Sequence, residues 1–240
     1  MGQNKHNLTF HHDHSLVLNE RTNTLTSDEE GCSSIVLFLN DGVQKSVLKL
    51  GGTLNEPQIL PHVQKLGIAV PSLLAAGTVT IDQTNPVYAK LCDDFRERAL
   101  DEDLGPDRVN YVHLEYLPGI PLARLGQGAD YRSLLLQTID ILYTLNMASI
   151  RHGDIQPNNI IIHHDKAYLI DWSSAEVTNG CSSDFVQFIQ LVVFYLHVIE
   201  TDSEKRKMYY ADNLCRREIY TSKDITVAKE KVTELVQKYV

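Results

Sequence analysis

The stretch His152-Gly-Asp-Ile-Gln-Pro-Asn-Asn-Ile160, followed by Tyr168-Leu-Ile-Asp-Trp172, is the most informative part of this sequence. Asp154 and Asn159 lie five residues apart, and Asp171 lies twelve residues beyond Asn159. Two short β runs joined by a turn lie between Asn159 and Asp171, and a strand-turn-strand of this kind brings the two ends of the segment together. We therefore expect two carboxylates and one amide to meet in a single site.

This arrangement resembles the catalytic loop of protein kinases, H-x-D-x-x-x-x-N, together with the metal-binding aspartate of D-F-G. The resemblance implies that Asp154 is the base that accepts or orients the attacking hydroxyl, with His152 and Gln156 as supporting residues of the same loop. It also implies that Asn159 and Asp171 bind Mg²⁺, a hard ion that takes oxygen ligands. On the alternative interpretation, His152 and Asp154 only cap a turn and Asp171 only ends a strand.

A lysine and a glutamate upstream agree with this resemblance. Residues 35–50 are predicted to form a β-hairpin, and Val47-Leu-Lys-Leu50 on its return strand resembles the V-A-I-K strand of kinases. By that resemblance Lys49 would bind the α- and β-phosphates of ATP, and Glu56, on a helix expected over 54–66, would pair with it. Lys45 is the competing lysine because it lies on the same face of the strand.

Two further segments match the resemblance through their position in the chain. Gly31-Cys-Ser-Ser34 precedes the hairpin, where a phosphate-covering loop belongs, and Gly31, Ser33 and Ser34 are its candidate phosphate contacts. Leu114-Glu-Tyr-Leu117 resembles the kinase hinge, in which the Glu115 carbonyl and the Leu117 N–H would bind adenine. The alternatives are a plain turn for the first segment and the end of a strand for the second.

The distribution of β and helical patterns predicts an α+β fold with two lobes of the protein-kinase-like type. A β-rich first half meets a mainly helical second half across residues 116–120, and the resemblance implies an ATP cleft between the lobes. We expect a flexible N-terminal tail at 1–14, an N-lobe at 15–116 and a C-lobe at 117–240. Strands are also expected at 73–80, 87–91 and 109–116, and a helix over 131–147.

Details of the motifs favour one branch of the kinase-like superfamily. His-Gly-Asp and Asp-Trp, with Glu115-Tyr-Leu-Pro-Gly119, look more like the aminoglycoside phosphotransferase and choline-kinase branch than like conventional protein kinases. Gly153 replaces the arginine of H-R-D, Ser173 replaces the glycine of D-F-G, and no A-P-E motif follows. Compact atypical protein kinases, including the one that works with the tRNA threonylcarbamoylation machinery, are similarly short and remain an alternative branch.

Apolar residues recur at three- and four-residue steps over 184–199, which predicts a buried helix. Asp184 opens this helix. In the kinase fold, an aspartate at the start of such a helix often braces the backbone of the catalytic loop. We therefore expect Asp184 either to bond the backbone near Arg151-His152 or to serve only as an ordinary N-cap.

Composition limits the remaining possibilities. The net charge of −9 argues against a general nucleic-acid binder, and the four scattered cysteines form no C-x-x-C pair. The polar first residues and the absence of a long apolar run predict a cytoplasmic protein with no secretory signal and no membrane span. The expected function is the Mg²⁺-dependent transfer of the γ-phosphate of ATP to an unknown hydroxyl acceptor, with a small molecule favoured over a protein. The alternative function is that of a pseudokinase scaffold, with or without a protein partner. Two features favour it: the single glycine of the loop at 31–34, and Gln156.

Overall fold

A computed structural model describes residues 8–10, 15–18, 21–30, 35–51, 55–80, 108–126, 128–178, 183–189 and 224–240. The chain folds as two compact units, of which the first comprises Met1–Gln58 and Pro71–Tyr116. The second comprises Ile59–Val70 and Leu117–Val240. The lobe boundaries predicted from the sequence remain a prediction.

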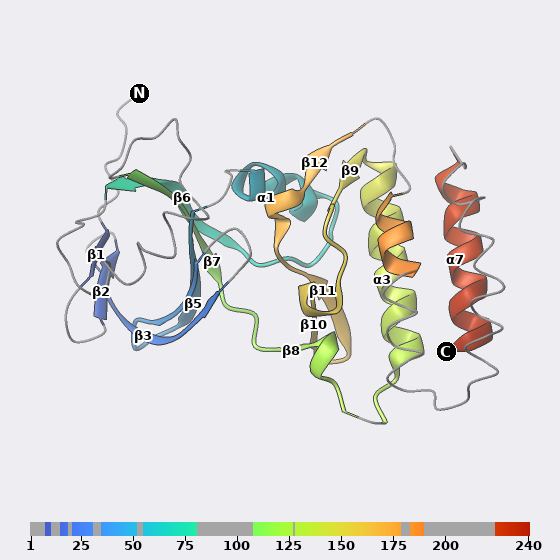
Figure 1. The fold of residues 1–240 in the computed structure, drawn as a ribbon, viewed down its shortest axis with the longest axis horizontal. Coiled ribbons are helices and arrows are strands. Elements are labelled where there is room, and N and C mark those ends of the chain that lie inside the picture. The colour runs from blue at the N-terminus through green and yellow to red at the C-terminus, as the bar shows by residue number, and fades with distance from the viewer. Residues whose placement is uncertain are drawn as a thin grey trace. The chain divides into compact units, whose positions relative to one another are not determined.

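The first unit is built on a seven-stranded antiparallel sheet in the order β1-β2-β3-β4-β5-β7-β6 (Figure 1). Its strands are β1 (Leu8–Phe10), β2 (Ser15–Leu18), β3 (Arg21–Glu30), β4 (Ile35–Asn40), β5 (Lys45–Leu50), β6 (Leu73–Thr80) and β7 (Arg108–Glu115). Alternate residues of neighbouring strands face one side and form a core, as the two-residue period of a strand requires. This core consists of Leu16, Leu18, Leu37, Leu39, Leu48, Leu50, Val79, Val109 and Tyr111.

The hairpin of β4 and β5 forms where its turn residues predict it. The Asn40 side chain accepts a hydrogen bond from the Gly42 N–H, and the Asp41 side chain accepts from the N–H groups of Val43 and Gln44. Gly42 has φ +86°, a conformation that glycine adopts without steric cost. The hairpin and the strands at 73–80 and 109–116 are therefore confirmed, whereas the strand expected at 87–91 lies outside the described residues.

Helix α1 spans Asn55–Lys65, close to the predicted 54–66. Glu56 lies in its first turn and Lys65 in its last, where each charge is favoured by the helix dipole. Gly67, with φ +75°, follows the helix and ends it in the left-handed conformation that is usual after a helix C-terminus.

The second unit combines short strands with helices. Its described part includes α1 from Ile59 onward, and its other elements there are β8 (Ile120–Pro121), α3 (Tyr131–Met147), β9 (Ile150–Arg151), β10 (Ile160–His163), β11 (Lys166–Leu169), β12 (Glu176–Val177) and α7 (Ile225–Tyr239). Within the described residues, 3₁₀ turns span Leu122–Arg124, Pro157–Asn159 and Trp172–Ser174. Helix α3 has the predicted bounds, and the described part of the predicted helix at 184–199 is helical over 183–189.

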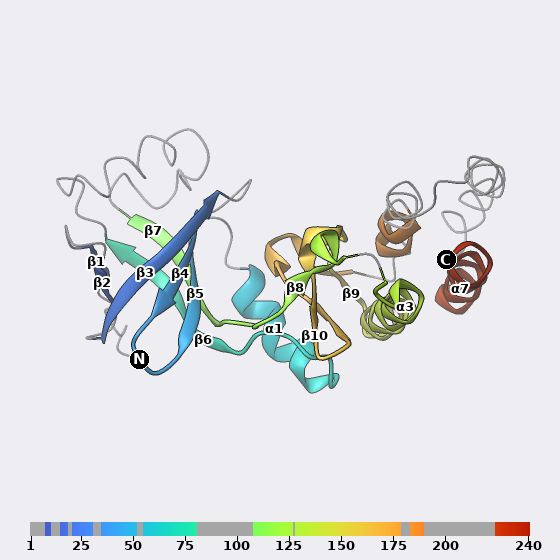
Figure 2. The same cartoon turned by 90° about the horizontal axis from the view of Figure 1, so that it is seen from below.

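Helix α7 packs beside α3, as both views show (Figure 1, Figure 2). The Lys229 ammonium lies 2.7 Å from the Asp140 carboxylate, and Arg132 donates a hydrogen bond to the Gln237 carbonyl near the end of α7. The last helix therefore belongs to the same unit as α3, although no sequence motif marked it.

The expectation of a flexible tail at the start of the chain needs correction. The segment 1–14, expected to be a flexible tail, contains β1, which pairs with β2 from Leu8↔Leu18 to Phe10↔Leu16. Pairing with a neighbouring strand supplies the backbone hydrogen bonds that a free tail would lack.

Among the helices of the described ranges, none is long and apolar enough to cross a membrane.

Candidate functional site

The backbone of the loop at 152–155 is held by Asp184. One carboxylate oxygen accepts a hydrogen bond from the His152 N–H at 2.8 Å, and the other accepts from the Gly153 N–H at 3.0 Å. The expected contact of Asp184 with the loop backbone is therefore confirmed. The side chain is fully buried, and this burial raises the pKa of Asp184, while the two loop hydrogen bonds act in the opposite direction.

Gln187, one helical turn further on, holds the same loop with its side-chain amide. Its Oε1 accepts from the Ile155 N–H and its Nε2 donates to the Gly153 carbonyl, both at 2.8 Å. The sequence showed Gln187 only as a polar interruption of an apolar helix. A polar residue three positions after Asp184 was the available signal, because residues three apart share one helix face.

His152 links the loop to the end of strand β11. Its Nε2 lies 3.1 Å from the Ile170 carbonyl, and its Nδ1 lies 3.3 Å from the Asp154 N–H. A carbonyl only accepts and an N–H only donates, so the ring carries its hydrogen on Nε2 and accepts with Nδ1. The buried ring also packs edge-on against Trp172, with 4.6 Å between centroids. His152 is thus a structural bridge between the Asp154 loop and the Asp171 segment.

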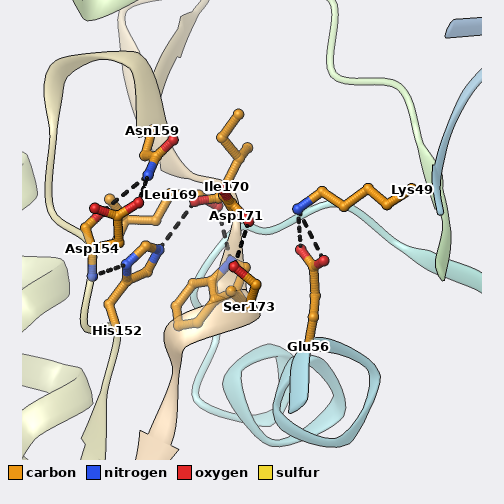
Figure 3. A network of polar contacts seen from close by, with 10 residues as sticks. Lys49, Glu56, His152, Asp154, Asn159, Leu169, Ile170, Asp171 and Ser173 are labelled. Atoms are coloured by element: carbon orange, nitrogen blue, oxygen red, sulfur yellow. Dashed lines mark hydrogen bonds and ion pairs between the residues drawn. The ribbon is translucent and has the colours of Figure 1, made fainter. Parts of the chain in front are cut away.

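Two amides orient the carboxylate of Asp154, and Figure 3 shows that of Asn159. The Asp154 Oδ2 accepts from Asn159 Nδ2 at 2.7 Å and from Gln156 Nε2 at 2.9 Å. Asn159 Nδ2 also donates to the Asp154 carbonyl at 3.0 Å. Because the nitrogen of Asn159 faces Asp154, its amide oxygen is the atom that a metal ion could bind. Gln156 contacts Asp154 directly, which the sequence did not predict.

Asp171 lies beside Asn159, as the strand-turn-strand predicted. Strands β10 and β11 pair from Ile160↔Leu169, and the Ile170 N–H donates to the Asn159 carbonyl at 3.0 Å. Asp171 has φ +63°, an uncommon left-handed conformation for a residue other than glycine. Its Oδ1 accepts from the Ser173 hydroxyl at 3.0 Å, so the serine that replaces the D-F-G glycine orients this carboxylate.

The Asn159 and Asp171 pair fits Mg²⁺ as a donor set. A carboxylate and an amide supply the oxygen ligands that a hard cation prefers, and Mg²⁺ usually takes its other ligands from water and substrate phosphates. In the described part of the chain, no group of three or more His, Cys, Asp or Glu side chains could hold a metal ion.

Gly153 explains one departure from the H-R-D pattern. Its φ is +83°, and a Cβ at this position would lie 2.5 Å from the Ser174 carbonyl oxygen. A side chain here would meet both an unfavourable backbone conformation and a backbone atom that cannot move aside. The loop of this protein therefore requires glycine where conventional protein kinases have arginine.

The first unit contains the predicted ion pair of Lys49 and Glu56 (Figure 3). The Lys49 Nζ lies 2.9 Å from Glu56 Oε2 and 3.2 Å from Oε1, and both residues are buried. Lys45 is exposed instead, and its ammonium lies 5.6 Å from the centroid of the Tyr116 ring. Of the two lysines considered, Lys49 is the one that pairs with Glu56.

The remaining candidate residues are not assembled by the described structure. Gly31, Ser33 and Ser34 lie outside the described residues. Glu115 is exposed at the end of β7, and its side chain accepts from the Ser72 hydroxyl at 2.7 Å. The Leu117 carbonyl accepts from the Gly119 N–H at 2.9 Å. The adenine contacts of Glu115 and Leu117 stay a prediction.

Comparisons with known proteins agree with the kinase-like arrangement. Residues 108–186 match the model of the RIO domain, and this segment includes Asp154, Asn159, Asp171 and Asp184. No curated protein sequence matches the chain significantly. Among solved structures, monomeric WbdD is similar with a TM-score of 0.56 and 16% identity over 94% of this chain and 52% of that chain.

Two further structures show the same likeness. The bifunctional kinase-methyltransferase WbdD matches with a TM-score of 0.55 and 16% identity over 94% of this chain and 49% of that chain. Vaccinia related kinase 3 matches with a TM-score of 0.52 and 14% identity over 99% of this chain and 92% of that chain. The chain spans about half the length of the WbdD chains that it matches.

The chain has a protein-kinase-like fold, with a sheet-rich unit and a mainly helical unit. The predicted α+β class and the predicted kinase-like superfamily are thus confirmed. At identities of 14–17%, the likeness to solved structures concerns the fold alone. The placement closest to aminoglycoside phosphotransferases and choline kinases stays a prediction.

Proposed function

We propose that this protein is an ATP-dependent phosphotransferase that moves the γ-phosphate of ATP to a hydroxyl acceptor. The observation that carries the proposal is the assembly of Asp154, Asn159 and Asp171 within one unit. Asn159 Nδ2 binds the Asp154 carboxylate at 2.7 Å, while its backbone carbonyl accepts from the Ile170 N–H beside Asp171. A base and two metal ligands at this spacing are what phosphoryl transfer requires of a protein.

Asp154 acts as the base in this proposal. The acceptor oxygen forms a bond to the γ-phosphorus, the bond from that phosphorus to the bridging oxygen breaks, and ADP leaves with the electron pair. The acceptor proton passes to the Asp154 carboxylate. Because Asn159 and Gln156 both donate to Oδ2, we assign Oδ1 as the atom that receives the proton.

The other residues bind and orient the phosphates. Asn159, through its amide oxygen, and Asp171 would hold Mg²⁺, which when bound neutralises charge on the phosphate groups. Ser173 holds the Asp171 carboxylate in place. Lys49 binds phosphate oxygens as a point charge, and Glu56 fixes the position of the ammonium group.

The acceptor is proposed to be a small molecule, which follows from the His-Gly-Asp and Asp-Trp motifs. One observation favours a second candidate, an atypical protein kinase, because residues 108–186 match the RIO domain. The two candidates share the site and the chemistry and differ only in the acceptor. Gln156 was the residue of the loop that favoured a pseudokinase on sequence. Its amide binds the Asp154 carboxylate, a contact that is compatible with an enzyme as well as with a pseudokinase.

The test is a phosphate-transfer assay with the full chain, γ-labelled ATP and Mg²⁺. Sugars, aminoglycosides, amino alcohols and generic protein substrates serve as acceptors, with Asp154→Asn as the matched variant. We expect transfer to one class of acceptor and a loss of about 10²-fold or more in kcat for the variant. Nucleotide binding without transfer to any acceptor would instead support a pseudokinase, and equal transfer by Asp154→Asn would reject the role of Asp154.

A further inference from the structure

We propose that Gln187 is a positioning residue that sets the backbone conformation of Asp154. This inference rests on the proposed role of Asp154 as the base. The side-chain amide of Gln187 makes two hydrogen bonds of 2.8 Å, one to the Gly153 carbonyl and one to the Ile155 N–H. These two groups belong to the two peptide planes on either side of Asp154.

Holding both peptide planes restricts Asp154 more than a single bond could. Each peptide plane is rigid, so the conformation of Asp154 is set by how its two flanking planes are oriented. The Gly153 carbonyl fixes the plane before Asp154, and the Ile155 N–H fixes the plane after it. Both bonds come from one planar amide, which holds the two planes in a fixed relation to each other.

Asp184 alone does not supply this restraint. Its two hydrogen bonds go to the N–H groups of His152 and Gly153 and end before Asp154. Gly153 lies between the two held stretches with φ +83°, and glycine has more backbone freedom than any other residue. Gln187 therefore restrains the segment immediately after the most flexible residue of the loop.

The surroundings of Gln187 indicate that its amide is there for these bonds. Its immediate neighbours in the helix are all buried and apolar: Phe185, Val186, Phe188 and Ile189. Gln187 is half-buried and shares its helix face with Asp184, whose carboxylate binds the same loop. An apolar residue at 187 would leave the Gly153 carbonyl and the Ile155 N–H without this partner.

The experiment compares Gln187→Met with a matched control, Gln137→Met. Methionine keeps the length of the side chain and removes both hydrogen bonds. Gln137 on α3 binds backbone in the same way, since its Nε2 donates to the Asp165 carbonyl at 3.0 Å and its Oε1 accepts from the Ala167 N–H at 3.2 Å. It holds the turn between β10 and β11 and touches no proposed site residue, so it controls for the loss of an amide clamp in the same unit.

We expect Gln187→Met to lower kcat by about 10-fold or more and to change KM for ATP by less than about 2-fold, because misplaced catalytic groups chiefly reduce the rate of the chemical step. Gln137→Met should leave kcat within about 2-fold of wild type. Combining Gln187→Met with Asp154→Asn should lower kcat little beyond Asp154→Asn alone, because residues that act as a unit are not additive. Equal kcat losses in the two Met variants, or additive losses in the double variant, overturn the inference.

Hydrogen exchange at the Ile155 amide separates this inference from the proposed function. We expect exchange at Ile155 to be faster in Gln187→Met and unchanged in Gln137→Met. If the wild-type chain transfers no phosphate, the proposed function fails. If exchange at the Ile155 amide is also unchanged in Gln187→Met, the proposed positioning of the loop by Gln187 fails as well. If the wild-type chain is folded but inactive and exchange at Ile155 is faster in Gln187→Met, Gln187 still restrains the loop structurally.

Discussion

Replacing Asp184 with alanine tests whether the buried helix supports the catalytic loop or is merely capped at its start. In the structure, both carboxylate oxygens bind loop N–H groups, those of His152 and Gly153, at 2.8 and 3.0 Å. The replacement therefore leaves two backbone donors without this partner. A helix that lost only an N-cap would leave the loop as it is.

The structure sets the size of the expected effect. An unpaired buried donor costs about 1–3 kcal/mol, whereas loss of an N-cap alone costs about 1 kcal/mol. His152 is fully buried, but Gly153 is half-buried, so water can partly satisfy the second donor. Burial also opposes the charge of Asp184, as its raised pKa indicates. We therefore expect Asp184→Ala to lower the free energy of unfolding by about 3 kcal/mol.

Urea unfolding and steady-state kinetics together provide the assay. We expect the variant to remain folded at low temperature and to bind ATP, with kcat reduced by about 10-fold or more because Asp154 loses its support. A stability loss of only about 1 kcal/mol with unchanged kcat would refute the argument, since that is the effect of an ordinary cap.

Asp184→Asn adds a prediction with a definite sign against pH. Burial raises the folded-state pKa of Asp184 above its ordinary value of 3.8. The stability contributed by such a group is present below the unfolded pKa and is lost as pH rises through the folded pKa. Asparagine does not titrate, so wild type should gain stability relative to Asp184→Asn as pH falls through this window. Urea unfolding at several pH values measures the difference, and the opposite trend would contradict the assignment.

Three further changes test the rest of the site. Asp171→Ala should abolish the Mg²⁺-dependent tightening of ATP binding, as measured by isothermal titration with and without Mg²⁺. Lys49→Arg should lower activity because a planar guanidinium cannot replace a point charge, whereas Lys45→Arg, at an exposed lysine, should be nearly silent; equal losses would refute this choice. Gly153→Ala should cost more than about 2 kcal/mol of stability, combining left-handed strain with a carbonyl at 2.5 Å, while Gly128→Ala, at φ +96° with nothing within 4 Å, should show the strain alone in urea unfolding.

The sequence by itself determined the parts of the site that depend on local geometry. Asp154 and Asn159 lie five residues apart on one loop, and two short strands return the chain from Asn159 to Asp171. The turn residues of the β4–β5 hairpin and the apolar spacing over 131–147 also act over short distances. Local patterns of this kind depend on backbone propensity and side-chain periodicity, which the sequence records directly.

Only the tertiary structure decided which side chains support that loop. Asp184 and Gln187 bind backbone groups more than thirty positions earlier in the chain. From the sequence, Asp184 could equally have been an ordinary N-cap, and Gln187 was only a polar residue that interrupts an apolar helix. The pairing of Lys49 with Glu56, by contrast, was predicted from the sequence, and the structure confirms it. Every residue except proline has the same backbone N–H and C=O groups. The sequence therefore cannot show which backbone group a distant side chain will bind. The partners of such side chains are therefore decided by how the chain packs.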